Sequence, residues 1–142
     1  MGRKADVKLR LEVESCDKSS SHNYGEVLKL LPEPRYYHII GETRILTDGW
    51  VLPTPNTKTL INFTSAYSTY EIDECTDSFL KYWNTYYDSL NIIIKKYGYS
   101  LYLNFEITVY NLHYPALIFK KEFIDFISNL NIELSFYFYN DD

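Results

Sequence analysis

Four carboxylates lie close together in the sequence, and paired carboxylates are a common basis of enzyme chemistry. They are Glu71, Asp73, Glu74 and Asp77. Two carboxylates can catalyse acid–base reactions when one keeps its proton and the other releases it. Negative side chains at the start of a helix also stabilise that helix through its dipole, and Asp73 and Asp77 fall one turn apart, outside the apolar stripe. We therefore predict a solvated acidic surface, not a catalytic pair, with Asp73, Glu74 and Asp77 available to bind a basic partner.

The other reactive residue types show no spacing that indicates a catalytic or metal-binding site. His22, His38 and His113 have no second His or Cys at metal-ligand spacing, and neither cysteine belongs to a CxxC pair. Cys75 falls on an apolar helix stripe, so it is predicted to be buried and unreactive. The sequence contains no GxGxxG or GxxxxGK phosphate loop and no GxSxG serine motif. We predict no catalytic residue, no metal ligand and no cofactor.

Tyrosine is the most unusual feature of the composition. The chain contains 15 Tyr and 8 Phe, and aromatic residues make up 18% of it. In the last strand Tyr137 and Tyr139 alternate with phenylalanines, so they lie opposite the core face, as Tyr102 and Tyr110 do in an earlier strand. If these strands are neighbours, the four rings form one aromatic band. Such a band is first a means of stabilising the sheet and second a candidate partner surface, with Tyr137 and Tyr139 as anchors.

The charge balance argues against nucleic acid as a partner. Lys and Arg total 14 against 19 Asp and Glu, which gives a net charge of −5. Nucleic-acid binding needs a basic stripe that neutralises phosphates, whereas the one basic cluster, at residues 3–10, is followed directly by Glu12 and Glu14. A basic protein is the better electrostatic match.

Length and composition indicate one ordinary globular domain over residues 1–142. Hydrophobic residues make up 46% of the chain and charged residues 23%, which is typical of a chain that buries a sizeable core. With only Cys16 and Cys75, a reducing compartment is expected instead of a disulfide framework. The amino-terminal segment lacks the apolar run of a signal peptide, and no stretch reaches the length of a membrane span. We therefore expect a cytoplasmic protein with no membrane partner.

The elements that must position these residues follow from hydrophobic periodicity. Alternation of apolar and polar residues predicts strands, and apolar residues every three or four positions predict helices. The predicted order is strand 7–13, helix 24–31, two short strands within 35–53, strand 60–68, a long helix within 68–97, strand 100–110, helix 120–130 and a last strand over 132–139. Ser68 and Glu71 have the spacing of a capping box, and Gly98 is predicted to end the long helix.

This order favours an α+β domain with an antiparallel or mixed sheet and helices packed mainly on one face. A strand, a short helix and a further strand occur near each end of the chain, around the long helix. Two ferredoxin-like halves are a second arrangement that would produce this repeated order of elements, although the two ends share no sequence identity.

Together, these landmarks resemble the bacterial domain-of-unknown-function family 4279. The resemblance covers residues 6–139 and rests on the first alternating strand, "LLPEP", Gly41, "DGW" ending in Trp50, the long helix and "FKKEFIDFISNLNIELSFYFY". Trp50 is expected to be a packing residue, not a binding residue. The family has no accepted catalytic residues, so the resemblance transfers none to this chain.

Small acidic proteins of this kind are often encoded beside secreted toxins and neutralise them, so the resemblance implies an immunity protein. We expect it to bind a cognate toxin domain stoichiometrically, a basic nuclease being the favoured class. The acidic residues Asp73, Glu74 and Asp77 would steer the partner, and Tyr137 and Tyr139 would anchor it.

Two other functions stay open on the sequence alone. One is a small enzyme, for which a deep pocket gathering Glu106, Tyr110 and His113 would be the sign. The other is a homo-oligomeric structural module joined through the last strand, for which a symmetric interface would be the sign. Both a monomer and a homodimer fit the sequence.

Overall fold

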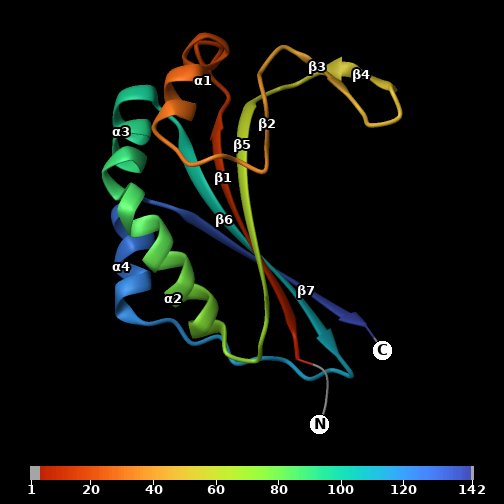
Figure 1. Ribbon diagram of the computed structural model, residues 1–142, viewed down its shortest axis with the longest axis vertical. Coiled ribbons are helices and arrows are strands. Elements are labelled where there is room, and N and C mark those ends of the chain that lie inside the picture. Colours follow the sequence, from red (N-terminus) through yellow and green to blue (C-terminus); the bar gives the residue numbers. More distant parts are fainter. Residues whose placement is uncertain (1–3, 142) are drawn as a thin grey trace.

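The computed structural model describes residues 4–141, apart from the side chain of Arg44. Its elements are, in chain order, β1 (Asp6–Ser15), α1 (Ser20–Lys29), β2 (Tyr36–His38), β3 (Thr43–Ile45), β4 (Val51–Pro55), β5 (Thr59–Ser68), α2 (Ile72–Trp83), the 3₁₀ turn η1 (Asn84–Tyr86), α3 (Tyr87–Tyr97), β6 (Ser100–Tyr110), α4 (Lys121–Asn129) and β7 (Glu133–Asp141). Figure 1 shows the helices gathered on one side of a twisted sheet, with a small hairpin projecting from the other side.

Five strands form one mixed sheet in the order β2-β5-β1-β6-β7. β1 lies at its centre and pairs antiparallel with β5 and β6, whereas β7 pairs parallel with β6. The parallel pair requires a crossover, which the segment containing α4 supplies. The predicted α+β class with a mixed sheet is confirmed, but these five strands form one continuous sheet and not two ferredoxin-like halves.

The central strand shows why the sheet has one dry face. Val7, Leu9, Leu11 and Val13 are almost fully buried and belong to the core between sheet and helices. The charged residues between them point to the opposite side, because successive side chains of a strand alternate. Each fully buried side chain of this kind contributes about 1.5–3 kcal/mol to folding. The helices therefore cover one face, and the other stays open.

The predicted long helix is broken into α2 and α3 by η1. The Thr85 hydroxyl donates a hydrogen bond to the carbonyl of Tyr82 at 2.7 Å, and such side-chain bonds to the preceding turn bend helices. α3 ends at Gly98, whose φ of 72° confirms the predicted left-handed stop. None of the helices within residues 4–141 combines the length and the hydropathy needed to cross a membrane.

The start of α2 also differs from the prediction. Glu71, not Ser68, occupies the N-cap position. The Thr69 side-chain oxygen accepts a hydrogen bond from the backbone N–H of Glu71 at 3.0 Å, and its hydroxyl donates to the Glu74 carboxylate at 3.1 Å. Thr69 therefore fixes the end of β5 to the first turn of α2.

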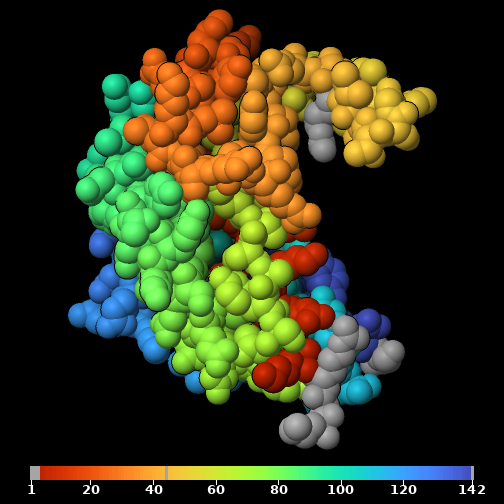
Figure 2. All heavy atoms as spheres, viewed as in Figure 1, coloured from red at the N-terminus to blue at the C-terminus, as the bar shows by residue number. Residues whose placement is uncertain are grey.

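A separate two-stranded sheet, β3 and β4, forms an arm over residues 42–56. Its turn follows the Asp48-Gly49 signal: the Trp50 N–H donates to Asp48 Oδ1 at 2.9 Å, and Gly49 has a φ of 87°. At its base the Asn56 N–H donates to the Glu42 carbonyl at 2.9 Å. In Figure 2 the arm projects away from the rest of the molecule.

Candidate functional site

The open side of the sheet and the arm together enclose a hollow. Figure 2 shows this hollow between the arm and the far ends of β6 and β7. We define the concave face as the outward side chains of β1, β5, β6 and β7, together with the arm that projects over them. Concave surfaces of this kind can contact a protein partner on several sides at once.

Acidic side chains outnumber basic ones on the concave face. The acids are Asp6, Glu12, Glu14, Glu106, Glu133 and Asp141, and the bases are Lys8 and Arg10 with Lys58 at the margin. Arg10 pairs with Glu106 at 3.3 Å, and Lys58 pairs with Glu14 at 2.6 Å. Because these pairs use most of the positive charge, the face keeps an acidic excess that matches a basic partner.

Glu12 lies in the middle of this face and is partly desolvated. Burial, followed by the negative charge of Glu14, raises the pKa of Glu12 above its ordinary value. The Asn104 side-chain amide donates to Glu12 Oε1 at 2.8 Å and partly offsets that effect. A carboxylate in this position therefore reduces the stability of the fold at neutral pH.

Two buried donors on the same face lack an acceptor within residues 4–141. They are Arg10 Nε and Asn62 Nδ2. An unpaired buried donor costs about 1–3 kcal/mol. Both donors therefore lie on the concave face with no acceptor among the described protein atoms.

The arm carries an exposed apolar tip. Trp50 is 64% exposed and Ile45 is 71% exposed, with Leu46 and Val51 beside them. An isolated two-stranded hairpin has no second layer against which it can bury a face. The prediction that Trp50 is a packing residue is therefore wrong, because the turn places it on the arm, away from the core.

The predicted tyrosine anchors are exposed on the concave face. Tyr137 is 50% and Tyr139 54% exposed, and they lie opposite Glu106 and Thr108 across the β6–β7 pair. Across the same pair, Tyr102 lies opposite Glu133 and Tyr110 opposite Asp141. The strands are neighbours as required, but the expected aromatic band is a pattern of tyrosines facing mainly acids. Tyrosine rings beside carboxylates suit lysine and arginine side chains of a partner.

The predicted acidic residues lie elsewhere, on α2 in the helical layer. Asp77 pairs with Lys120 at 2.8 Å, with both side chains about half exposed. Asp73 lies one turn earlier on the same side of α2, whereas Glu74 accepts a hydrogen bond from Thr69 at the end of β5. The structure therefore separates the five predicted binding residues into two surfaces, on opposite sides of the sheet.

The predicted alternative enzyme site is not assembled as one pocket. Glu106 pairs with Arg10, the Tyr110 hydroxyl donates to Asp6, and His113 is exposed in a turn. The three principal cavities in the described part of the chain are lined by other residues. Among residues 4–141, no group of three or more His, Cys, Asp and Glu side chains is arranged to hold a metal ion.

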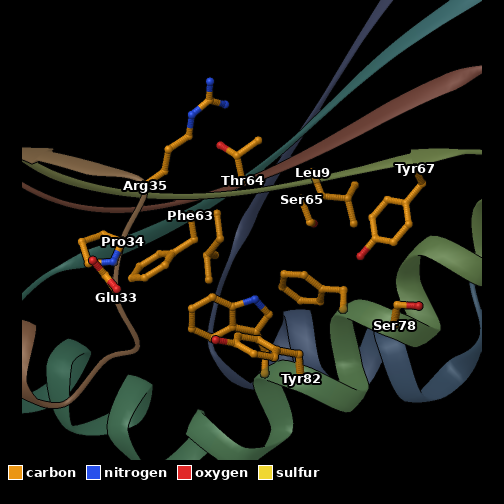
Figure 3. Close-up of a pocket in the computed structure, with 13 residues that line it drawn as sticks. Leu9, Glu33, Pro34, Arg35, Phe63, Thr64, Ser65, Tyr67, Ser78 and Tyr82 are labelled. Carbon is orange, nitrogen blue, oxygen red and sulfur yellow. The ribbon is translucent and has the colours of Figure 1, made fainter.

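The largest of these cavities is a groove that the sequence interpretation missed. It has a volume of about 620 Å³ and lies between the β5 edge and α2. Figure 3 shows Phe63, Ser65 and Tyr67 pointing into it from β5 and Tyr82 from α2, whereas Arg35 and Thr64 point away. A small serine between two aromatic residues on the core-facing side of a strand was the available signal.

Comparison with known proteins adds no relative: no family model, no curated protein and no solved structure matches this chain. The resemblance to family 4279 therefore stays a prediction.

Proposed function

We propose that this protein neutralises a basic toxin domain by binding it stoichiometrically on the concave face. The proposal identifies it as a cytoplasmic immunity protein, and a nuclease is the toxin class whose basic, phosphate-binding surface best complements an acidic inhibitor. Its action would be to cover the toxin's active site or substrate surface, with no chemistry of its own.

The observation that carries the proposal is the arm, which projects from the open side of the sheet (Figure 1) and contains the exposed Trp50. Tryptophan is the residue type most enriched at binding hot spots, and large exposed apolar patches rimmed by polar residues mark partner sites. The arm tip and Tyr139 lie at opposite ends of the concave face. A partner seated there would touch both apolar anchors and the acids between them.

The test is to co-express the tagged protein with the product of the neighbouring reading frame and identify the co-purified chain by mass spectrometry. A stoichiometric complex in which the partner's toxicity disappears supports the proposal. In that complex Trp50→Ala should weaken binding by at least about tenfold. Tyr37→Ala is the matched control, because Tyr37 is 48% exposed on the opposite side of the sheet. A partnerless protein, or a complex indifferent to Trp50→Ala, would overturn the proposal.

The α2 acids have a different expected role, since they lie outside the concave face. Charges at that distance affect the association rate more than the bound state. Reversal of both Asp73 and Asp77 to lysine should slow association and flatten its dependence on salt, with dissociation unchanged, as stopped-flow mixing at several salt concentrations would show. An unchanged association rate would exclude this patch from steering.

Self-association is a second candidate, favoured by the outer edge of β7. Within the described residues β7 has a strand partner on one side only, and unpaired strand edges readily pair with another chain. Phe138 and Tyr139 are exposed there. Sedimentation velocity over a range of concentrations decides this question: a dimer that Phe138→Lys dissociates would support it, and a monomer throughout would exclude it.

A further inference from the structure

Half of the outer edge of β5 has no strand beside it. β2 pairs with residues 60–62 of β5, and within residues 4–141 no strand pairs with the remaining part on that side. β2 begins only at Tyr36, because the chain that leads into it contains Pro32 and Pro34, which cannot donate to a sheet. The residues from Thr64 to Ser68 are therefore an exposed edge.

The backbone groups of this edge point outward. In a strand, the N–H and C=O groups of alternate residues point to opposite sides. The Asn62 carbonyl accepts a hydrogen bond from the Arg35 N–H at 2.8 Å, on the outer side of β5. By the same alternation, Thr64, Ala66 and Ser68 direct their backbone groups to that side. They lie beyond the Tyr36–Asn62 pair, where the pairing of β2 with β5 stops. They form a template for one more strand.

The groove lies directly beneath this edge. Its walls include Phe63, Tyr67, Phe79, Tyr82 and Trp83. Ser65 leaves the space between Phe63 and Tyr67 unfilled (Figure 3). Tyr82 is 52% exposed at the rim, although most large side chains of α2 are buried. A strand added to β5 would send every second side chain down into this aromatic space.

Acidic side chains flank the groove at both ends. Glu33 lines it just before the start of β2. At the other end, Glu71 and Glu74 share the side of α2 that carries Ser78, a groove residue. A side-chain hydrogen bond with Glu74, and then the charges of Glu74 and Asp73, raise the pKa of Glu71. A cation placed there would relieve this repulsion between like charges.

We infer that the β5 edge and its groove bind an extended peptide segment of a protein partner, which adds a strand to the sheet. The segment places apolar side chains at alternate positions in the groove and carries lysine or arginine near its ends. Main-chain hydrogen bonds supply affinity in this mode of recognition, and the pockets supply specificity. The inference does not rest on the proposed function, because the groove and the concave face are different surfaces.

The test is selection from a displayed library of random peptides of about seven residues, the length that spans this edge with its flanks. Selected peptides should alternate apolar with other residues and carry a basic residue near an end. On binding, the backbone amides of Thr64, Ala66 and Ser68 should become protected from hydrogen exchange. Protection confined to backbone amides of α2, with none on β5, would contradict strand addition.

Ala66→Pro is the decisive variant, because it removes an outward N–H without touching the β1–β5 pairing. It should weaken peptide binding by about tenfold, whereas Ala66→Val keeps the N–H and should bind as the wild type does. Tyr82→Ala should weaken binding to a similar extent. Circular dichroism and a urea titration establish that each variant is folded.

The two proposals can fail separately. Trp50→Ala should leave peptide affinity unchanged, and Tyr82→Ala, on α2 in the helical layer, should leave the toxin complex unchanged. If no selected peptide depends on the Ala66 N–H, the inference is overturned. It is also overturned if the β5 amides become protected with increasing concentration of the protein alone, since a second copy would then occupy the edge.

Discussion

At the scale of single residues, Glu12 shows how the concave face reduces stability. Because burial and Glu14 raise the pKa of Glu12 above its ordinary value of 4.5, the unfolded chain loses this proton before the folded chain does. The contribution of Glu12 to stability is therefore present below pH 4.5 and is lost as pH rises through the folded-state pKa. Glu12→Gln keeps an acceptor for Asn104 but carries no charge.

We expect Glu12→Gln to raise the urea midpoint at pH 7 and to have no effect near pH 4. The control is Glu42→Gln, an exposed glutamate at the base of the arm, which should leave both midpoints unchanged. If the proposed function is correct, the same Glu12→Gln protein should bind its partner more weakly. A more stable variant with full affinity would separate this carboxylate from binding.

The two cysteines should differ sharply in reactivity. Cys16 is exposed, whereas Cys75 is fully buried on α2 as the sequence predicted. Burial, with a contribution from the charge of Glu74, raises the pKa of Cys75 from 9.0 to about 11. Because the thiolate is the reactive form, iodoacetamide at pH 8 should modify Cys16 in the folded protein and reach Cys75 only in urea. Peptide mass mapping identifies the labelled site, and equal labelling of both residues would be inconsistent with this packing.

The raised pKa of Cys75 also affects the stability of the fold at alkaline pH. Between pH 9 and 11 the unfolded chain releases the Cys75 proton while the folded chain keeps it, so the free energy of unfolding falls across this window. Cys75→Ala should show a smaller fall than the wild type in urea titrations at these pH values. A parallel fall in both proteins would assign the loss to other groups.

At the scale of elements, two glycines differ in their expected effect on stability, because one ends a helix and the other lies inside one. Gly98 ends α3 with a φ of 72°, whereas Gly25 lies inside α1. In both cases no described heavy atom lies within 4 Å of an added Cβ, apart from adjoining backbone. Gly98→Ala should therefore destabilise by about 1–2 kcal/mol through backbone strain alone. Gly25→Ala should stabilise by about 0.5–1 kcal/mol through helix propensity. Urea titration measures the free energy of unfolding of both variants. A change of the same sign in both would contradict this explanation.

Elements with a strict local pattern were predictable from the sequence. The alternation in β1 and β6 and the glycine after α3 follow directly from side-chain geometry and backbone freedom. The break at η1 was not predictable, because the spacing of apolar residues at three and four positions continues through it from Phe79 to Leu90. The exposure of Trp50 and the groove were missed for another reason: they depend on which distant segments cover a surface, and local periodicity carries no such information.

At the scale of the whole molecule, the arm is nearly independent of the core. None of the core cluster's residues lies within 42–56, and the base is closed by the hydrogen bonds from Gly41 to Asn56 and from Asn56 to Glu42. Replacing residues 43–55 with a short glycine turn keeps the two chain ends that this base already holds together. Loop length has only a weak effect on stability.

The free energy of unfolding of the shortened protein should therefore lie within about 1 kcal/mol of the wild-type value, since no buried apolar surface of the core is lost. Its affinity for the toxin partner should fall far more than the affinity of the Trp50→Ala variant does, because the whole arm is removed. Its affinity for a peptide on β5 should be unchanged, because that groove is lined by β1, β5, α2 and the segment before β2. Urea titration and the two binding measurements on one variant would thus assign separate roles to core, arm and edge. Unfolding of the shortened protein would instead show that the arm supports the fold, and its exposed tryptophan would then need a structural explanation.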